Sequence, residues 1–157
     1  MMKELQWYNI ATLLRDYLKS FRYNNGKRLF ECMVDRDDLT IHLGMSNTGE
    51  YPSIDIIFGD ESDANKQDDI NSAIVQLWVD IYVKGEATAD INANDCLYRQ
   101  LFNVENEFCT ALRYFNRDLH KRGLGTNCKI ISFLSDGDAQ MPANGMVRAV
   151  IDIEWRK

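Results

Sequence analysis

Three clusters of acidic residues are the part of this sequence best suited to chemistry, because closely spaced carboxylates can bind hard divalent cations. The clusters are "DRDD" (Asp35, Asp37, Asp38), "DESD" (Asp60, Glu61, Asp63) and "DGD" (Asp136, Asp138). The stretch "DRDDLTIHLGMS" does not fit an EF-hand loop, since Leu39 stands where the loop needs Gly and Ser46 where it needs Glu. Acidic residues and Gly also build ordinary turns. We therefore interpret the clusters as turns, with Mg²⁺ or Ca²⁺ binding as the alternative.

No other group of residues forms a catalytic constellation. The sequence has no G-x-S-x-G, no P-loop and no H-E-x-x-H. The Gly-rich "GLGTN" at 123–127 follows a predicted helix, whereas a phosphate-binding loop precedes one. The four cysteines (Cys32, Cys96, Cys109 and Cys128) show no CxxC spacing, and His42 and His120 are the only histidines. We expect reduced packing thiols, no zinc site, no cofactor and no enzyme activity.

Composition and charge narrow the class of protein. The chain of 157 residues is 45% hydrophobic and 27% charged, which predicts one globular domain over residues 1–157. The net charge is −6, and basic clusters are small, as at Lys27-Arg28 and Lys121-Arg122, which argues against nucleic-acid binding as the main function. No apolar run reaches the roughly 20 residues that span a bilayer. "MMKELQWYNI" lacks the features of a signal peptide, so we expect a cytoplasmic origin.

Two amphipathic helices are predicted from apolar residues at spacings of three and four. The first is N-terminal and is marked by Trp7, Ile10, Leu14, Tyr17 and Phe21. Asn24-Asn25-Gly26 is expected to end it, with Gly26 as the left-handed C-cap. The second runs from about Asn94 to Lys121, with Gly123 as its expected C-cap, and is marked by Leu97, Leu101, Val104, Phe108, Leu112, Phe115 and Leu119.

Alternating polarity predicts the strands. In "IVQLWVDIYVKGEA", residues 74–87, Val75, Leu77, Val79, Ile81 and Val83 alternate with polar and aromatic residues. Residues 28–45 are read as two short strands that turn at Asp35–Asp38, and "YPSIDIIFGD" as a strand with Ile54, Ile56 and Phe58 on one face. "CKIISFLSD" and "MVRAVIDIEWRK" are predicted to be the last two strands, joined by a loop at "DGDAQMPANG". The fold class that follows is α+β, a mostly antiparallel sheet with two main helices packed on one face.

A sheet face that contacts only solvent needs only polar residues, but the second face of this sheet also carries aromatic ones. Trp78 and Tyr82 lie four apart on the strand at 74–87 and point the same way. On the last strand, Met146, Arg148 and Val150 lie opposite the apolar face. Aromatic residues, Met and Arg are enriched at protein–protein interfaces. We predict that Trp78, Tyr82 and Arg148 belong to a subunit interface. The alternatives are that a third helix or a loop covers this face, or that Trp78 and Tyr82 are singly exposed, as surface aromatics often are.

The order of these elements resembles the tail terminator and tail-completion proteins of long-tailed bacteriophages and prophages. The resemblance covers most of residues 50–157 and rests on "IVQLWVDIYVKG", the long helix "CLYRQLFNVENEFCTALRYF", "KIISFLSDGDAQ" and the closing "GMVRAVIDIEWRK". It implies a hexameric ring of α+β subunits that caps the tail tube, ends its polymerisation and meets the head–tail connector protein. It also implies a virion tail protein assembled in the host cytoplasm, with no catalytic residues and with DNA only as passing cargo.

Two other functions remain open from the sequence. The chain could be another neck or head–tail joining protein, or a small adaptor domain that holds a peptide against its sheet. It could also be a metal-dependent hydrolase that uses the acidic clusters, in which case Asp60 and Asp136 would be ligands.

Overall fold

The fold was obtained as a computed structural model, which describes residues 3–30, 40–44, 53–61, 72–84, 92–122, 126–138 and 144–156. Helix α1 spans Lys3–Ser20 and is followed by β1 (Thr40–Leu43), β2 (Ser53–Glu61) and β3 (Ser72–Lys84). Helix α2 spans Ala93–Lys121, and β4 (Thr126–Asp138) and β5 (Asn144–Arg156) close the chain. The α+β class expected from the sequence is confirmed.

The strands form one sheet of order β1-β2-β3-β5-β4. Three of its four pairings are antiparallel, and β1 runs parallel to β2. The longest pairing joins β3 to β5 without a break, from Ser72 opposite Arg156 to Lys84 opposite Asn144. β2 and β4 each contain one irregularity, at Phe58/Glu61 and at Ile130/Ser132. The expected mostly antiparallel sheet is therefore confirmed.

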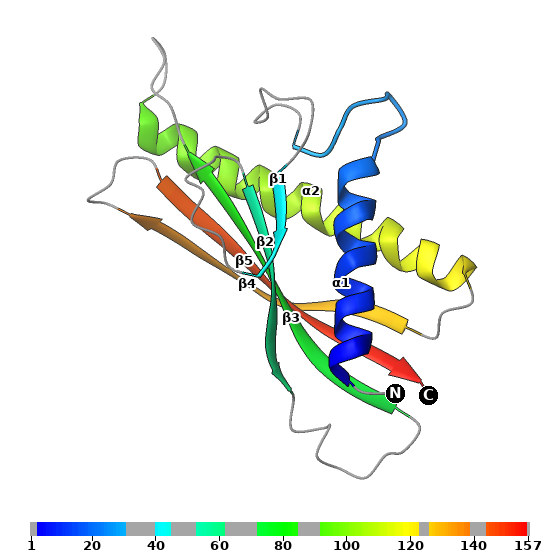
Figure 1. Cartoon of the computed structure of the whole chain (residues 1–157). Helices are drawn as coiled ribbons and strands as arrows, with labels where there is room; N and C mark the ends of the chain where they lie inside the picture. The colour runs from blue at the N-terminus through cyan, green and yellow to red at the C-terminus, as the bar shows by residue number, and fades with distance from the viewer. Residues whose placement is uncertain are drawn as a thin grey trace.

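The core lies between the helices and one face of the sheet. Helix α1 contacts β1, β2 and β3, whereas α2 contacts β3, β4 and β5, and the two helices cross (Figure 1). All seven residues that mark the second helix in the sequence are at most 5% exposed. They belong to one cluster with buried residues of α1 and the odd-numbered side chains of β3, Leu77, Val79, Ile81 and Val83. Burial of this continuous apolar surface is the main force that stabilises the fold.

The two ends of α2 are set by different residues. Asn92 is the N-cap, and its side chain accepts a 2.9 Å hydrogen bond from the backbone N–H of Asp95. The C-cap is Arg122, in right-handed geometry, whose N–H donates to the carbonyl of Asp118. The expected C-cap residue, Gly123, lies outside the described residues. His120 and Lys121 lie in the last turn, where positive charge favours the helix dipole.

The prediction for the end of α1 was wrong. The helix ends at Ser20, before Asn24-Asn25-Gly26. These residues instead form a tight turn in which Gly26 donates to the carbonyl of Tyr23, and Tyr23 donates to that of Lys27. Gly26 does have the left-handed φ of 83° that was expected of it, but inside this turn. A glycine in the sequence indicates a left-handed backbone position, but it does not indicate whether that position ends a helix or lies in a turn.

The strand boundaries differ from the prediction in two places. "DGD" was assigned to a loop, but Asp136 and Asp138 lie within β4, opposite Met146 and Asn144 of β5. Of the two short strands expected at 28–45, Thr40–Leu43 is present as β1, whereas Leu29 and Phe30 lie in a turn; the turn expected at Asp35–Asp38 lies outside the described residues. Within the described parts of the chain, neither helix is long and apolar enough to cross a membrane.

Candidate functional site

The three predicted site residues lie together on the sheet face that points away from the core. β3 and β5 are neighbours, and their register puts Trp78 opposite Val150, Asp80 opposite Arg148, and Tyr82 opposite Met146. We call the side formed by Gln76, Trp78, Asp80, Tyr82, Met146, Arg148, Val150 and Asp152 the outer face. Asp80 and Val150 are buried, and the other six are partly buried. The structure therefore brings residues 78, 82 and 148 to one surface, as alternation along two strands requires.

An ion pair fixes the centre of the outer face. The Arg148 guanidinium donates two hydrogen bonds to Asp80, from Nε to Oδ1 at 2.7 Å and from Nη2 to Oδ2 at 2.8 Å. This two-pronged geometry matches the planar guanidinium to the carboxylate. Hydrogen bonding to Asp80 raises the pKa of Arg148 above its ordinary value. Asp80 is only 1% exposed, so this pairing compensates the cost of a nearly buried charge.

Trp78 is held by the same arginine and by the neighbouring strand. The guanidinium carbon of Arg148 lies 4.4 Å from the centroid of the indole ring, in cation–π geometry. On β2, a Cβ added to Gly59 would lie 2.7 Å from Nε1 of Trp78, so the ring edge occupies the space that a side chain there would need. The indole N–H is directed to Oε1 of Gln76 at 3.4 Å. Trp78 is thus a rigid part of the outer face and is only partly buried.

A row of polar residues crosses the sheet at this level. The registers place His42 of β1 beside Asp55 of β2, Asp55 beside Asp80 of β3, and Asp80 beside Arg148 of β5. Asp55 is fully buried. Nε2 of His42, and Oδ1 of Asp152 further along the outer face, are buried atoms that have no hydrogen-bond partner among the described residues. Sequence reasoning missed Asp55 and Asp80 as site residues. An Asp inside each of two otherwise apolar strands was the available signal, but only the register joins them to Arg148.

The arrangement places two carboxylates, a histidine and an arginine side by side across four strands. These groups can donate and accept hydrogen bonds and carry charges of both signs, so they can bind a polar partner. Among the residues that the structure describes, no group of three or more His, Cys, Asp and Glu could hold a metal ion. Asp35, Asp37, Asp38 and Asp63 lie outside those residues, and Asp60 and Glu61 end β2.

Two of the cysteines, Cys109 and Cys128, have surroundings that disfavour reactivity. Cys128 is 3% exposed, and burial raises the pKa of its thiol to about 12. Burial also raises the pKa of Cys109, which is partly buried on α2. A raised pKa disfavours the thiolate, which is the nucleophilic form. Cys96 is partly buried and reduced, and Cys32 lies outside the described residues.

A second surface was not predicted. Tyr98 and Phe102 lie one turn apart on α2 and are 68% and 65% exposed. In the sequence, Tyr98 directly follows the core residue Leu97, and Phe102 directly follows the core residue Leu101. On the helix, these positions face solvent. The helical spacing therefore places both aromatic residues on the solvent side of α2. They were not predicted because only the apolar residues of the buried face were used to identify this helix.

Comparison of the sequence with protein-family models and with curated proteins finds no match. The site must therefore be interpreted from its own residues.

Proposed function

We propose that this chain is a structural protein of a phage or prophage tail, which caps the tail tube, ends its polymerisation and joins the tail to the head connector. The observation that carries the proposal is the order of elements in one mostly antiparallel sheet: a helix, three strands, a long helix and a closing pair of strands. This is the order on which the resemblance to tail terminators rests. The partners that follow are other copies of the chain, the tail tube protein and the connector protein, with DNA passing through.

The outer face is the subunit contact in this proposal. Trp78, Tyr82, Met146 and Arg148 are all partly buried within a single chain, so a neighbouring subunit can bury them further. Asp80 and Gly59 hold Arg148 and Trp78 in place before any partner arrives. Rigid aromatic and arginine side chains lose little conformational entropy on association, which makes them effective anchors. A ring needs a contact between two different surfaces, so the outer face would meet another part of its neighbour.

The test is the mass of the purified protein in solution. We expect light scattering over a concentration series to show a hexamer that dissociates on dilution, and negative-stain images to show rings. A monomer at every concentration, alone and with the purified tail tube protein, would contradict the proposal.

A matched pair of variants locates the contact. Trp78→Ala is a poor probe because it also removes the cation–π partner of Arg148. Met146→Lys places a charge on the outer face without touching the Asp80–Arg148 pair, and its cross-strand neighbour on β4 is Asp136. Tyr98→Lys makes a comparable change on α2, away from the sheet face. We expect the first variant to abolish the hexamer and the second to keep it.

An adaptor domain that holds a peptide against the same face is the second candidate, because the outer face alone supports either reading. It predicts a stable monomer or dimer that retains a peptide-bearing partner in a pull-down and loses it with Met146→Lys. A hexamer lost with the same substitution would exclude this alternative.

A further inference from the structure

The charges of the chain are strongly segregated along the sequence. Residues 15–28 and 113–122 hold nine of the 18 lysines and arginines but only two of the 24 acidic residues, which gives these two segments a net charge of +7. The rest of the chain carries −13. The net charge of −6 therefore hides a strongly basic portion of the molecule.

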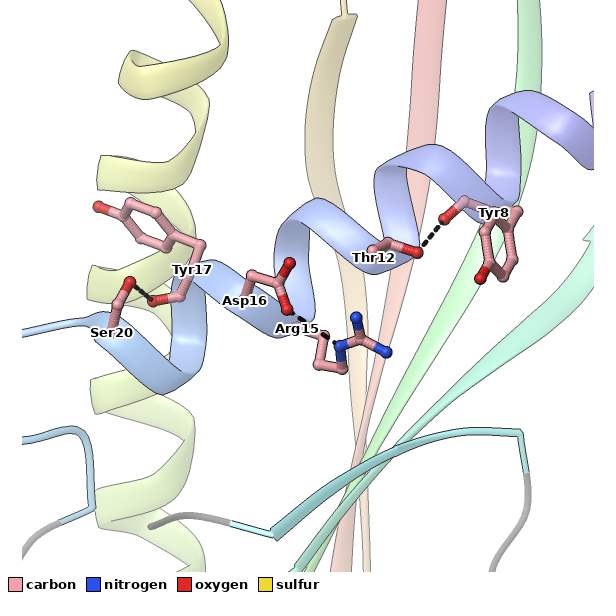
Figure 2. A network of polar contacts seen from close by, with 6 residues as sticks. All are labelled: Tyr8, Thr12, Arg15, Asp16, Tyr17 and Ser20. Atoms are coloured by element: carbon pink, nitrogen blue, oxygen red, sulfur yellow. Dashed lines mark hydrogen bonds and ion pairs between the residues drawn. The ribbon is translucent and has the colours of Figure 1, made fainter. Parts of the chain in front are cut away.

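The fold brings the two basic segments together. The Tyr17 ring, near the end of α1, lies 5.3 Å from the Phe115 ring of α2, and Phe21 lies 6.1 Å from Tyr114. The last turns of α1 thus pack beside the second half of α2, as the crossing of the helices shows (Figure 1). In Figure 2, Tyr17 points toward α2, whereas Arg15 points away from it. The contact between the two helices is thus made by aromatic rings, and Arg15 does not enter it.

Most of these cations are exposed. The exposed ones are Lys19, Arg22, Lys27, Arg113, Arg117, Lys121 and Arg122, and we call them the basic helix surface. Arg113, Arg117 and Lys121 recur every four residues along α2 and therefore lie about 6 Å apart along the helix axis. The guanidinium of Arg117 lies 5.3 Å from the centroid of the Tyr114 ring, which limits its freedom.

Ordinary structural roles account for only some of these charges. Lys121 lies in the last turn of α2 and Arg122 caps it, where positive charge compensates the helix dipole, but Arg113 and Arg117 lie one to two turns earlier. Local pairs neutralise Arg15 with Asp16 and Arg122 with Asp118, at 3.1 and 2.9 Å. The nearby Glu107 carboxylate already accepts hydrogen bonds from Tyr23 and from the backbone N–H of Phe30. A positive surface remains after these roles are counted.

We propose that the basic helix surface binds the phosphate backbone of nucleic acid, independently of base sequence. A duplex carries about one negative charge per 1.7 Å of its axis, so each exposed cation can lie close to a phosphate. A second copy of the chain also offers carboxylates, including the clusters at 35–38, 60–63 and 136–138, and the experiment below distinguishes this alternative. This function is additional to the proposed tail role. The cations that carry it lie on α2, at the end of α1 and in the turn after it, and not on the outer face of the sheet.

The experiment is fluorescence anisotropy with a labelled DNA duplex of about 30 base pairs and mixed sequence, over about 50 to 200 mM salt. The test variant is Arg113→Gln/Arg117→Gln. The matched control is Lys84→Gln/Arg99→Gln, which removes two exposed cations elsewhere and gives the same net charge of −8. We expect the test variant to bind about tenfold more weakly at low salt and to reduce the slope of log affinity against log salt by about 2. The control should change affinity by less than about twofold, since its cations lie outside the surface.

Three results would overturn the proposal: no binding of duplex by the wild-type chain at about 50 mM salt, equal losses in both variants, or strong dependence on base sequence. If the test variant instead binds duplex normally but loses self-association, the surface contacts another copy of the chain and not nucleic acid. Circular dichroism of both variants checks that the helices are retained, which is expected because all four substituted residues are exposed.

Discussion

At the scale of single residues, the pairing of Asp80 with Arg148 has the largest predicted energetic weight. Arg148→Ala would leave the Asp80 carboxylate, which is 1% exposed, without its two-pronged partner. Breaking one side of a buried ion pair costs several kcal/mol because the remaining charge stays buried. We expect the free energy of unfolding, measured by urea denaturation, to fall by about 3 kcal/mol.

The double variant Asp80→Ala/Arg148→Ala separates the pair from its surroundings. It removes both charges, so its loss should be clearly smaller than the sum of the two single losses. Arg99→Ala, on the exposed side of α2, is the control and should change stability by no more than about 0.5 kcal/mol. Additive single losses would show that the two side chains act independently.

Glu107 is a second residue whose chemistry can be measured. Its Oε1 accepts hydrogen bonds from the Tyr23 hydroxyl at 3.0 Å and from the N–H of Phe30 at 3.2 Å. Phe30 has a φ of 57°, which is uncommon for a residue other than Gly, so this bond helps to hold a strained turn. Burial raises the pKa of Glu107, although the hydrogen bonds oppose that shift.

The raised pKa fixes the sign of a pH effect. The folded state keeps the Glu107 proton to higher pH than the unfolded state, so this group's contribution to stability falls as pH rises above about 4.5. Glu107→Gln keeps the acceptor oxygen and removes the titration. The free energy of unfolding of Glu107→Gln, relative to that of the wild type, should therefore increase from about pH 4 to neutral pH and then level off. Glu107→Ala removes both the acceptor and the titration, so its loss of about 1 to 3 kcal/mol at low pH should become smaller toward neutral pH. A Gln variant with the wild-type pH profile would contradict this account.

At the scale of secondary-structure elements, Asn116 joins α2 to β4. Its amide donates to the carbonyl of Cys128 at 2.7 Å and accepts from the N–H of the same residue at 2.8 Å, as a neighbouring strand would. Asn116→Ala leaves both backbone groups unpaired beside a buried cysteine, so we expect a loss of about 2 kcal/mol. Hydrogen exchange should show faster exchange of the Cys128 amide, whereas Thr110→Ala, which loses only an exposed bond to its own helix, should leave that amide protected.

Elements with a sustained period were predictable from the sequence. Seven apolar residues at helical spacing identified α2 because each of them could be buried only on one helix face. The strand boundary at Asp136 was not predictable, since Asp-Gly-Asp is typical of turns and only pairing with Met146 and Gly145 of β5 extends β4 through it. Tertiary pairing overrides local preference at such positions.

Only part of the site was predictable from the sequence, because the pairing of strands is not a local property. Alternation places Trp78, Tyr82 and Arg148 on the non-core side of their strands without any knowledge of strand order. The ion pair depends on β3 and β5 being neighbours in one register, which no local pattern contains. The basic helix surface likewise combines segments about 100 residues apart, so the sequence showed two small basic clusters where the fold makes one surface.

At the scale of the whole molecule, the two layers present different chemistry. The sheet layer offers an outer face of rigid aromatic and arginine side chains, and the helix layer offers exposed cations on α1 and α2. A subunit in a ring must use different surfaces toward its neighbours and toward what passes through. Separation of the two surfaces on two layers allows both to be used at once.

The proposed ring predicts that self-association stabilises the fold through a contact that includes the outer face. Any partner that binds only the native state raises the apparent Tm with its concentration, and a second copy of the chain is such a partner. We expect the Tm of the wild-type chain, measured by calorimetry, to rise by several degrees over a hundredfold increase in protein concentration. Met146→Lys should match the wild-type Tm at high dilution but show no rise, whereas Tyr98→Lys and Arg113→Gln/Arg117→Gln should keep the rise. A Tm that is independent of concentration in the wild type would show that the outer face binds no second copy, and a lower Tm of Met146→Lys at high dilution would show that this substitution damages the subunit itself.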